Sequence, residues 1–141
     1  MIFLSYNWRD QAIAHEVDVL LRQADFDVWI DIRNLQPDVD ILRQLDQAIQ
    51  RCSVFVTVKP GSQNGSRWMR TELSIARAYG KATLSIRADS LHLAGQVRAI
   101  SRAIMAIVAQ RSLLDSENRP FPNLEPLRDP SARGTLRMSV A

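Results

Sequence analysis

The 141-residue sequence predicts an α/β fold in which a central parallel sheet of four to five strands carries helices on both faces. Three observations predict it. Short apolar runs alternate four times with longer segments whose apolar residues repeat at helical spacing. Clusters of turn residues separate several of these segments. Apolar residues make up 46% of the chain, which is enough for one sizeable core.

The first half of the chain alternates strand and helix twice. Each strand is a short apolar run that becomes polar at its end, as a buried parallel strand does. Each helix has apolar side chains every three or four residues, and an aspartate precedes the second helix as its N-cap. We expect a strand at residues 2–6, a helix at 13–24, a strand at 26–30 ending in Asp31, a loop at 32–38, and a helix that follows Asp38 or Asp40 and ends near residue 49.

The second half repeats the alternation and contains the clearest helix. Ser66 is a suitable N-cap because its hydroxyl satisfies backbone N–H groups at a helix start, and Gly80 suits a left-handed C-cap. Trp68 and Glu72 stand four residues apart and therefore share one face of this helix. We expect a strand at residues 53–58, a turn-rich loop at 59–65, this helix, a strand at 82–86, and a last helix that ends near Arg111.

The character of the sequence changes after Arg111. Prolines at positions 120, 122, 126 and 130 exclude a long helix in that part of the chain. We therefore expect one domain at residues 1–111 and a Pro-containing C-terminal tail or linker at residues 112–141. This segment is a linker, a strap over the domain, an arm for a neighbouring subunit, or a mobile tail.

Charge and histidine content argue against two kinds of site. The net charge is +3, and the cations are dispersed arginines, with Lys59 and Lys81 as the only lysines. This distribution forms no basic patch, so no nucleic-acid partner is expected. His15 and His92 have no cysteine or acidic partner at ligand spacing, so no metal site is expected.

The single cysteine and the hydropathy indicate a compartment. Cys52 begins an apolar strand, so we expect buried packing there, and a lone cysteine excludes an intramolecular disulfide. No apolar run is long enough to cross a bilayer, and a first strand at Ile2 leaves no room for a signal peptide. We therefore expect a cytoplasmic protein with no membrane partner.

Topology predicts where a ligand binds. Right-handed crossovers place the first and third strands side by side, as in a flavodoxin-like three-layer fold. Ligands bind such sheets at the carboxyl ends of the strands, and Glu72 lies near a helix start at this crevice, where functional acids occur. The walls of the crevice come from Ser5, Tyr6, Asn7, Trp8 and Arg9 on one side and from Ser66, Trp68 and Glu72 on the other.

Three motifs stand in order along residues 2 to about 87. They are Phe3-Leu4-Ser5-Tyr6 followed by Asp10, then Val28-Trp29-Ile30-Asp31 with Leu35 and Pro37, and then Ser66-x-Trp68-x-x-x-Glu72-Leu73. In this order and spacing they resemble the first box, the second strand with its BB loop, and the third main helix of the Toll/interleukin-1 receptor (TIR) domain. One departure is Asp38, which follows Pro37 where the family commonly has glycine.

The resemblance implies a specific reaction. Many bacterial and plant TIR domains cleave the nicotinamide–ribose bond of NAD⁺, and the glutamate that matches Glu72 is their catalytic residue. The products are nicotinamide and ADP-ribose or a cyclic ADP-ribose isomer. NAD⁺ is then the substrate, and no separate cofactor is implied. The resemblance also implies activation by oligomerisation, with further copies or other TIR domains as partners in immune or defence signalling.

The residues of the crevice fit this reaction. An ionised Glu72 can bind the ribose hydroxyls and stabilise an oxocarbenium-like transition state. Trp8 or Trp68 can stack on an aromatic ring, although packing is the favoured role of Trp68 and of Trp29. Arg9 and Arg33 either pair with the pyrophosphate or lie at the surface. The candidate NAD⁺-contacting residues are Ser5, Tyr6, Trp8, Arg9, Asp31, Arg33, Ser66 and Trp68.

Two other functions were weighed against NAD⁺ cleavage. A non-catalytic TIR scaffold that assembles signalling complexes through TIR–TIR contacts is favoured by the missing BB-loop glycine and by the tail. A phosphoacceptor domain of the response-regulator type needs an acidic pair after the first strand and an aspartate after the third. Ser5-Tyr6 and Val58-Lys59 stand at those positions and exclude it.

Overall fold

The computed structural model describes residues 1–60 and 66–119, so residues 61–65 of the turn-rich loop and residues 120–141 of the predicted tail lie outside the described part. The strands are β1 (Ile2–Ser5), β2 (Val28–Trp29), β3 (Val54–Lys59) and β4 (Ala82–Arg87). The α-helices are α1 (Gln11–Gln23), α2 (Asp31–Asn34), α3 (Ile41–Arg51), α4 (Arg67–Ala78) and α5 (Leu93–Glu117), and the 3₁₀ turns are η1 (Trp8–Asp10) and η2 (Ser90–His92).

The described strands form one parallel sheet in the order β2-β1-β3-β4. β1 lies at the centre, with Phe3 opposite Trp29 of β2 and Ser5 opposite Thr57 of β3. Because the strands are parallel, their carboxyl ends share one edge, where Ser5 ends β1. The predicted neighbouring of the first and third strands is confirmed, and the described residues contain four strands.

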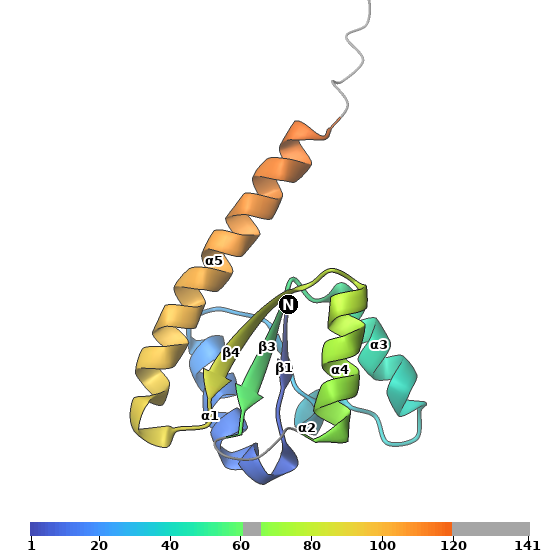
Figure 1. Cartoon of the computed structure of the whole chain (residues 1–141), viewed down its shortest axis with the longest axis vertical. Helices are drawn as coiled ribbons and strands as arrows, with labels where there is room; N and C mark the ends of the chain where they lie inside the picture. The colour runs from blue at the N-terminus through green and yellow to red at the C-terminus, as the bar shows by residue number, and fades with distance from the viewer. Residues whose placement is uncertain (61–65, 120–141) are drawn as a thin grey trace, which may run out of the picture.

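Helices cover both faces of the sheet (Figure 1). α1 and α5 lie on one face and pack on apolar side chains such as Leu4, Val56 and Ile86. α3 and α4 lie on the other face, where Phe3 is stacked between Trp29 and Phe55, with ring centroids 4.8 and 5.2 Å apart. The predicted three-layer α/β fold is confirmed, and so is the packing role of Trp29.

The predicted helix caps are also present. The Asp40 side chain accepts a hydrogen bond from the Arg43 amide at the start of α3, and the Ser66 side chain accepts one from the Met69 amide at the start of α4. Gly80 follows α4 with a φ of +64°, the left-handed conformation that glycine adopts without a Cβ penalty. Cys52 is buried, as its place in the sequence predicted.

Three elements differ most from the prediction. The strand predicted at residues 26–30 comprises only Val28 and Trp29, because its ladder with β1 pairs only these two residues. The segment predicted as a loop at residues 32–38 overlaps the helical turn α2, which is too short to show helical periodicity in the sequence. α5 continues past Arg111 to Glu117, with Leu113 and Leu114 exposed beyond the domain (Figure 1). The described helix therefore extends into the predicted tail, because no proline interrupts the backbone before residue 120.

Within residues 1–60 and 66–119, no helix combines the length and the apolar character needed to cross a membrane. The same residues contain no group of three or more His, Cys, Asp or Glu side chains placed to hold a metal ion.

Candidate functional site

Glu72 is a buried carboxylate on α4. Its position follows from the helix register, since the buried side chains of α4 are Met69, Glu72 and Ala76, which recur along one face. Only 9% of Glu72 is exposed. An acidic side chain on the apolar face of a helix is unfavourable unless it finds polar partners, so its surroundings decide its role.

Ser5 is the direct partner of Glu72. It is the last residue of β1 and only 2% exposed, and its hydroxyl donates a hydrogen bond to Oε2 of Glu72. Glu72 is thereby held at the carboxyl edge of the central strand. This is the edge at which ligands bind in parallel α/β sheets.

A second carboxylate stands beside the first. Asp31 begins α2, directly after the second strand, and its Oδ1 accepts hydrogen bonds from the Tyr6 hydroxyl at 2.5 Å and from the Ile32 amide at 2.7 Å. Tyr6 follows Ser5 in the chain, so β1 delivers one hydroxyl to each carboxylate. Ser5, Tyr6, Asp31 and Glu72 form what we call the acid cluster.

The surroundings of the acid cluster shift its pKa values. Burial raises the pKa of Glu72 to about 7, the hydrogen bond from Ser5 lowers it, and the charge of Asp31 raises it further. Burial, and then the hydrogen bond to Asp31, raises the pKa of Tyr6 well above its ordinary range. Tyr6 therefore acts as a neutral hydrogen-bond donor, whereas Glu72 changes its charge near neutral pH.

This arrangement is suited to stabilising a positive charge that develops on a bound molecule. A carboxylate that has lost most of its water interacts strongly with a positive charge placed next to it. A second carboxylate adds negative potential and can accept hydrogen bonds from hydroxyl groups.

The remaining predicted residues occupy different places around the cluster. Trp8 and Arg9 lie in η1, which begins after the capping residue Asn7, and both are exposed, Trp8 by 74%. Ser66 caps α4 with its hydroxyl. Trp68 lies one turn before Glu72 and is 50% exposed, so the packing role favoured by its helical spacing is wrong. Its ring extends to solvent because the buried face of α4 passes through Met69 and Glu72 instead.

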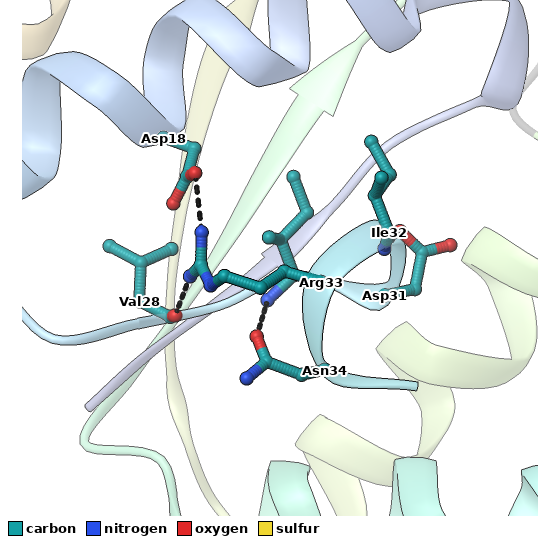
Figure 2. A network of polar contacts seen from close by, with 7 residues as sticks. Asp18, Val28, Asp31, Ile32, Arg33 and Asn34 are labelled. Atoms are coloured by element: carbon teal, nitrogen blue, oxygen red, sulfur yellow. Dashed lines mark hydrogen bonds and ion pairs between the residues drawn. The ribbon is translucent and has the colours of Figure 1, made fainter. Parts of the chain in front are cut away.

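Arg33 is not directed at the acid cluster. Its guanidinium donates from Nη1 to Asp18 Oδ2 at 2.7 Å and from Nη2 to the carbonyl oxygen of Val28 at 2.5 Å. Figure 2 shows Arg33 reaching from α2 toward Asp18 of α1, while Asp31 lies on the other side of the turn. A pyrophosphate group would therefore have to compete with Asp18 and Val28 for the Arg33 guanidinium.

Sequence reasoning missed this partner, Asp18. It is only 2% exposed and shares the buried face of α1 with Ala14, Val17 and Leu21. An acidic residue inside an apolar helical stripe was the available signal, because such a side chain needs a buried cationic or hydrogen-bonding partner.

A separate groove of about 480 Å³ lies at the amino ends of the strands, against α5. Its lining is largely apolar and includes Ile2, Phe26, Ile104 and Met105, and its acidic residues Asp25 and Asp27 are exposed. It contains no pairing of buried polar groups like that around Glu72. The acid cluster is therefore the stronger candidate for chemistry.

Comparison with models of known protein families identifies the family of this chain. A family model described as TIR domain matches residues 2–117, which includes every member of the acid cluster and most of the described chain. No curated protein sequence matches the chain at a significant level.

Proposed function

This chain belongs to the TIR domain family, and from this premise we propose that it is an NAD⁺ nucleosidase that breaks the bond between nicotinamide and ribose. The observation that carries the proposal is the buried position of Glu72, hydrogen-bonded to Ser5 and placed beside the Tyr6–Asp31 pair. This carboxylate also matches the glutamate that the catalytic members of the family use.

The reaction needs little from the protein beyond negative charge and positioning. When the C1′–N1 bond breaks, its electron pair passes to the nicotinamide ring nitrogen, which becomes neutral, and the ribose becomes an oxocarbenium ion. Water captures the cation and loses a proton to give ADP-ribose, or an adenine nitrogen captures it to give a cyclic isomer. No general acid is required, because the leaving group is already activated by its positive charge.

Glu72 supplies the principal electrostatic stabilisation in this proposal. In its ionised form it accepts hydrogen bonds from the ribose hydroxyls and interacts more strongly as positive charge develops on the sugar. Substrate binding replaces the Ser5 contact or shares Glu72 with it. Exposed Trp8 and Trp68 are available to stack on a ring of NAD⁺, and the proposal requires no cofactor besides the substrate NAD⁺ itself.

The direct test is to incubate the purified protein with NAD⁺ and resolve the products by chromatography. We expect nicotinamide release, and Glu72→Gln should reduce turnover about 10³-fold or more because the charge is lost while the shape is kept. Glu16→Gln, an exposed carboxylate on α1, is the matched control and should retain wild-type turnover. Equal turnover in wild type and Glu72→Gln under the same assembly conditions would exclude Glu72 as the catalytic residue.

A second candidate function is a non-catalytic TIR scaffold. One observation favours it: four large apolar side chains lie exposed on α2, on the first turn of α3 and on the segment between these helices, namely Ile32, Ile41, Leu42 and Val39. Such an exposed apolar surface is typical of a protein–protein contact. A scaffold would assemble equally well as wild type and as Glu72→Gln, and neither form would release nicotinamide.

A further inference from the structure

The Asp18–Arg33 pair joins three elements that follow one another along the chain, α1, β2 and α2. Arg33 of α2 contacts the carboxylate of Asp18 on α1 and the carbonyl oxygen of Val28 in β2 (Figure 2). Asp18 is almost fully buried, whereas about a third of the Arg33 side chain remains exposed. A guanidinium with two fixed acceptors constrains both the distance and the direction of its own backbone.

α2 depends on such contacts for its position. It is a single turn of four residues, none of them buried, and a helix of this length is not stable alone. Its internal hydrogen bonds, from the amides of Arg33 and Asn34 to the Ile30 carbonyl and from the Ile30 amide to the Asn34 side chain, shape the turn but do not attach it to the domain. Within the described part of the chain, its side-chain hydrogen bonds to residues outside the turn and its flanks are those of Arg33 and the one that Asp31 accepts from Tyr6.

Asp31 and Arg33 are two residues apart in this turn and point to opposite sides of it (Figure 2). Asp31 belongs to the acid cluster. It accepts a hydrogen bond from the Tyr6 hydroxyl, and its negative charge raises the pKa of Glu72. Loss of the Arg33 contacts would free the turn to move, and Asp31 would move with it. The pair is thus mechanically linked to the cluster without touching it.

We propose that Asp18 and Arg33 are positioning residues, which fix the α2 turn on α1 so that Asp31 stands beside Glu72. This role rests on the proposed NAD⁺ cleavage only for its effect on turnover. Its effect on the geometry of the cluster is a property of the ligand-free protein. The ion pair suits this role because a guanidinium that donates to two separate acceptors, the Asp18 carboxylate and the Val28 carbonyl, holds one geometry, whereas an apolar contact of the same size tolerates sliding.

The variants should remove the contact in ways that separate position from stability. Asp18→Asn removes the buried charge with little change in shape, and the partly exposed Arg33 can be solvated again. Arg33→Gln leaves the Asp18 carboxylate buried without its cation and therefore carries a risk of unfolding. The double variant Asp18→Asn/Arg33→Gln contains no unpaired buried charge, and Arg33→Lys keeps the cation but loses the planar group that donates to Asp18 and Val28 together. Glu16→Gln, exposed on the same helix, controls for the change in net charge.

The first measurement is the titration of Glu72 by carboxyl ¹³C NMR in the protein alone. The groups that face Glu72 among the described residues are Ser5, Tyr6 and Asp31, so displacement of Asp31 removes its negative charge from the set. We expect the pKa of Glu72 to fall in Asp18→Asn and in the double variant, to fall less in Arg33→Lys, and to stay unchanged in Glu16→Gln. Hydrogen exchange of the Ile32 amide should accelerate in the same order.

The second measurement is the steady-state kinetics of NAD⁺ cleavage. Misplacement of Asp31 should lower kcat about tenfold to a hundredfold, with a smaller change in KM, and the double variant should be no worse than the more impaired single variant. Folded variants in which Glu72 titrates as in wild type and the Ile32 amide stays protected would overturn the positioning role, whatever the activity. A wild-type protein that releases no nicotinamide would overturn the proposed reaction, while the titration would still decide the role of the pair.

Discussion

At the scale of single residues, the burial of Glu72 opposes stability. The pKa of this carboxyl is about 7 in the folded chain against an ordinary value of 4.5. A raised acid pKa means that the folded state binds the proton more tightly than the unfolded state does. Protonation of Glu72 therefore contributes stability to the fold, which is fully present below pH 4.5 and is lost as the pH rises toward 7.

This leads to a prediction for Glu72→Gln. At about 1.4 kcal/mol per pKa unit, removal of the buried charge should stabilise the fold by roughly 3 kcal/mol above pH 7, and by progressively less as the pH falls to the ordinary pKa of a glutamate. Denaturant unfolding of wild type and variant across this pH range measures the difference. A difference that does not change with pH would show that Glu72 titrates normally. Such a cost would fit the proposed catalytic role of Glu72, because active-site residues often lower the stability of their own protein.

Trp68 gives a second residue-scale prediction. Because half of its surface is exposed, Trp68→Ala should destabilise the fold by about 1 kcal/mol, well below the roughly 3–5 kcal/mol expected for a buried tryptophan. Its KM for NAD⁺ should rise if the ring stacks on substrate. Trp29→Ala is the matched comparison. Because Trp29 stacks on Phe3 in the core, this variant should show the full loss of stability expected for a buried tryptophan. Melting temperatures and kinetics of both variants separate packing from binding, and a large loss of stability in Trp68→Ala would contradict its exposed position.

At the scale of elements, the caps explain why the site helix begins where it does. The Ser66 hydroxyl accepts from the Met69 amide at 3.2 Å, which sets the register that turns Glu72 inward. Ser66→Ala should destabilise the protein by about 1 kcal/mol, and Ser66→Asp should restore most of it.

Ser74→Ala on the same helix is the control for this prediction. The Ser74 side chain is exposed in the middle of α4, and its hydroxyl donates a hydrogen bond to the Arg70 carbonyl oxygen. Its removal should therefore change the unfolding free energy little. Denaturant unfolding of the three variants gives the comparison. Equal effects of Ser66→Ala and Ser74→Ala would mean that the cap does not stabilise α4.

At the scale of the whole molecule, we predict that turnover depends on assembly. The acid cluster is bounded by the β1 end, α2 and α4, and a small domain has few further groups with which to exclude water. The exposed apolar residues on α2, on the first turn of α3 and between them follow the carboxyl end of β2 along the chain and suit contact with a second copy. Specific activity should therefore rise with protein concentration, together with particle size in light scattering.

The assembly prediction has a matched pair of variants. Leu42→Asp should reduce both the assembly and the specific activity, because Leu42 is 53% exposed on this apolar surface. Leu113→Asp makes the same change at an exposed leucine on the projecting end of α5 and should leave both unchanged. Constant specific activity from a protein that stays monomeric throughout would exclude the requirement for assembly.

The sequence alone determined the order of strands and helices, the caps at Asp40 and Ser66, the left-handed Gly80 and the placement of Glu72 at the carboxyl edge of the sheet. These features depend on short-range signals, such as helical periodicity and capping, and on topology rules that hold for parallel sheets. The caps and helices could be predicted because their signals lie within a few residues of each other, and the position of Glu72 because the connection rules apply to parallel sheets in general.

Only the tertiary structure decided how deeply Glu72 is buried, which hydroxyl meets which carboxylate, that Trp68 faces solvent, and that Arg33 turns to Asp18. Ser5 and Glu72 are 67 positions apart, and Tyr6 and Asp31 are 25 apart. Contacts over such separations depend on how α2 and α4 dock on the sheet, and a side chain's pKa depends on the water that this docking removes. The residues of the candidate site could therefore be named from the sequence, whereas its electrostatics arise from packing.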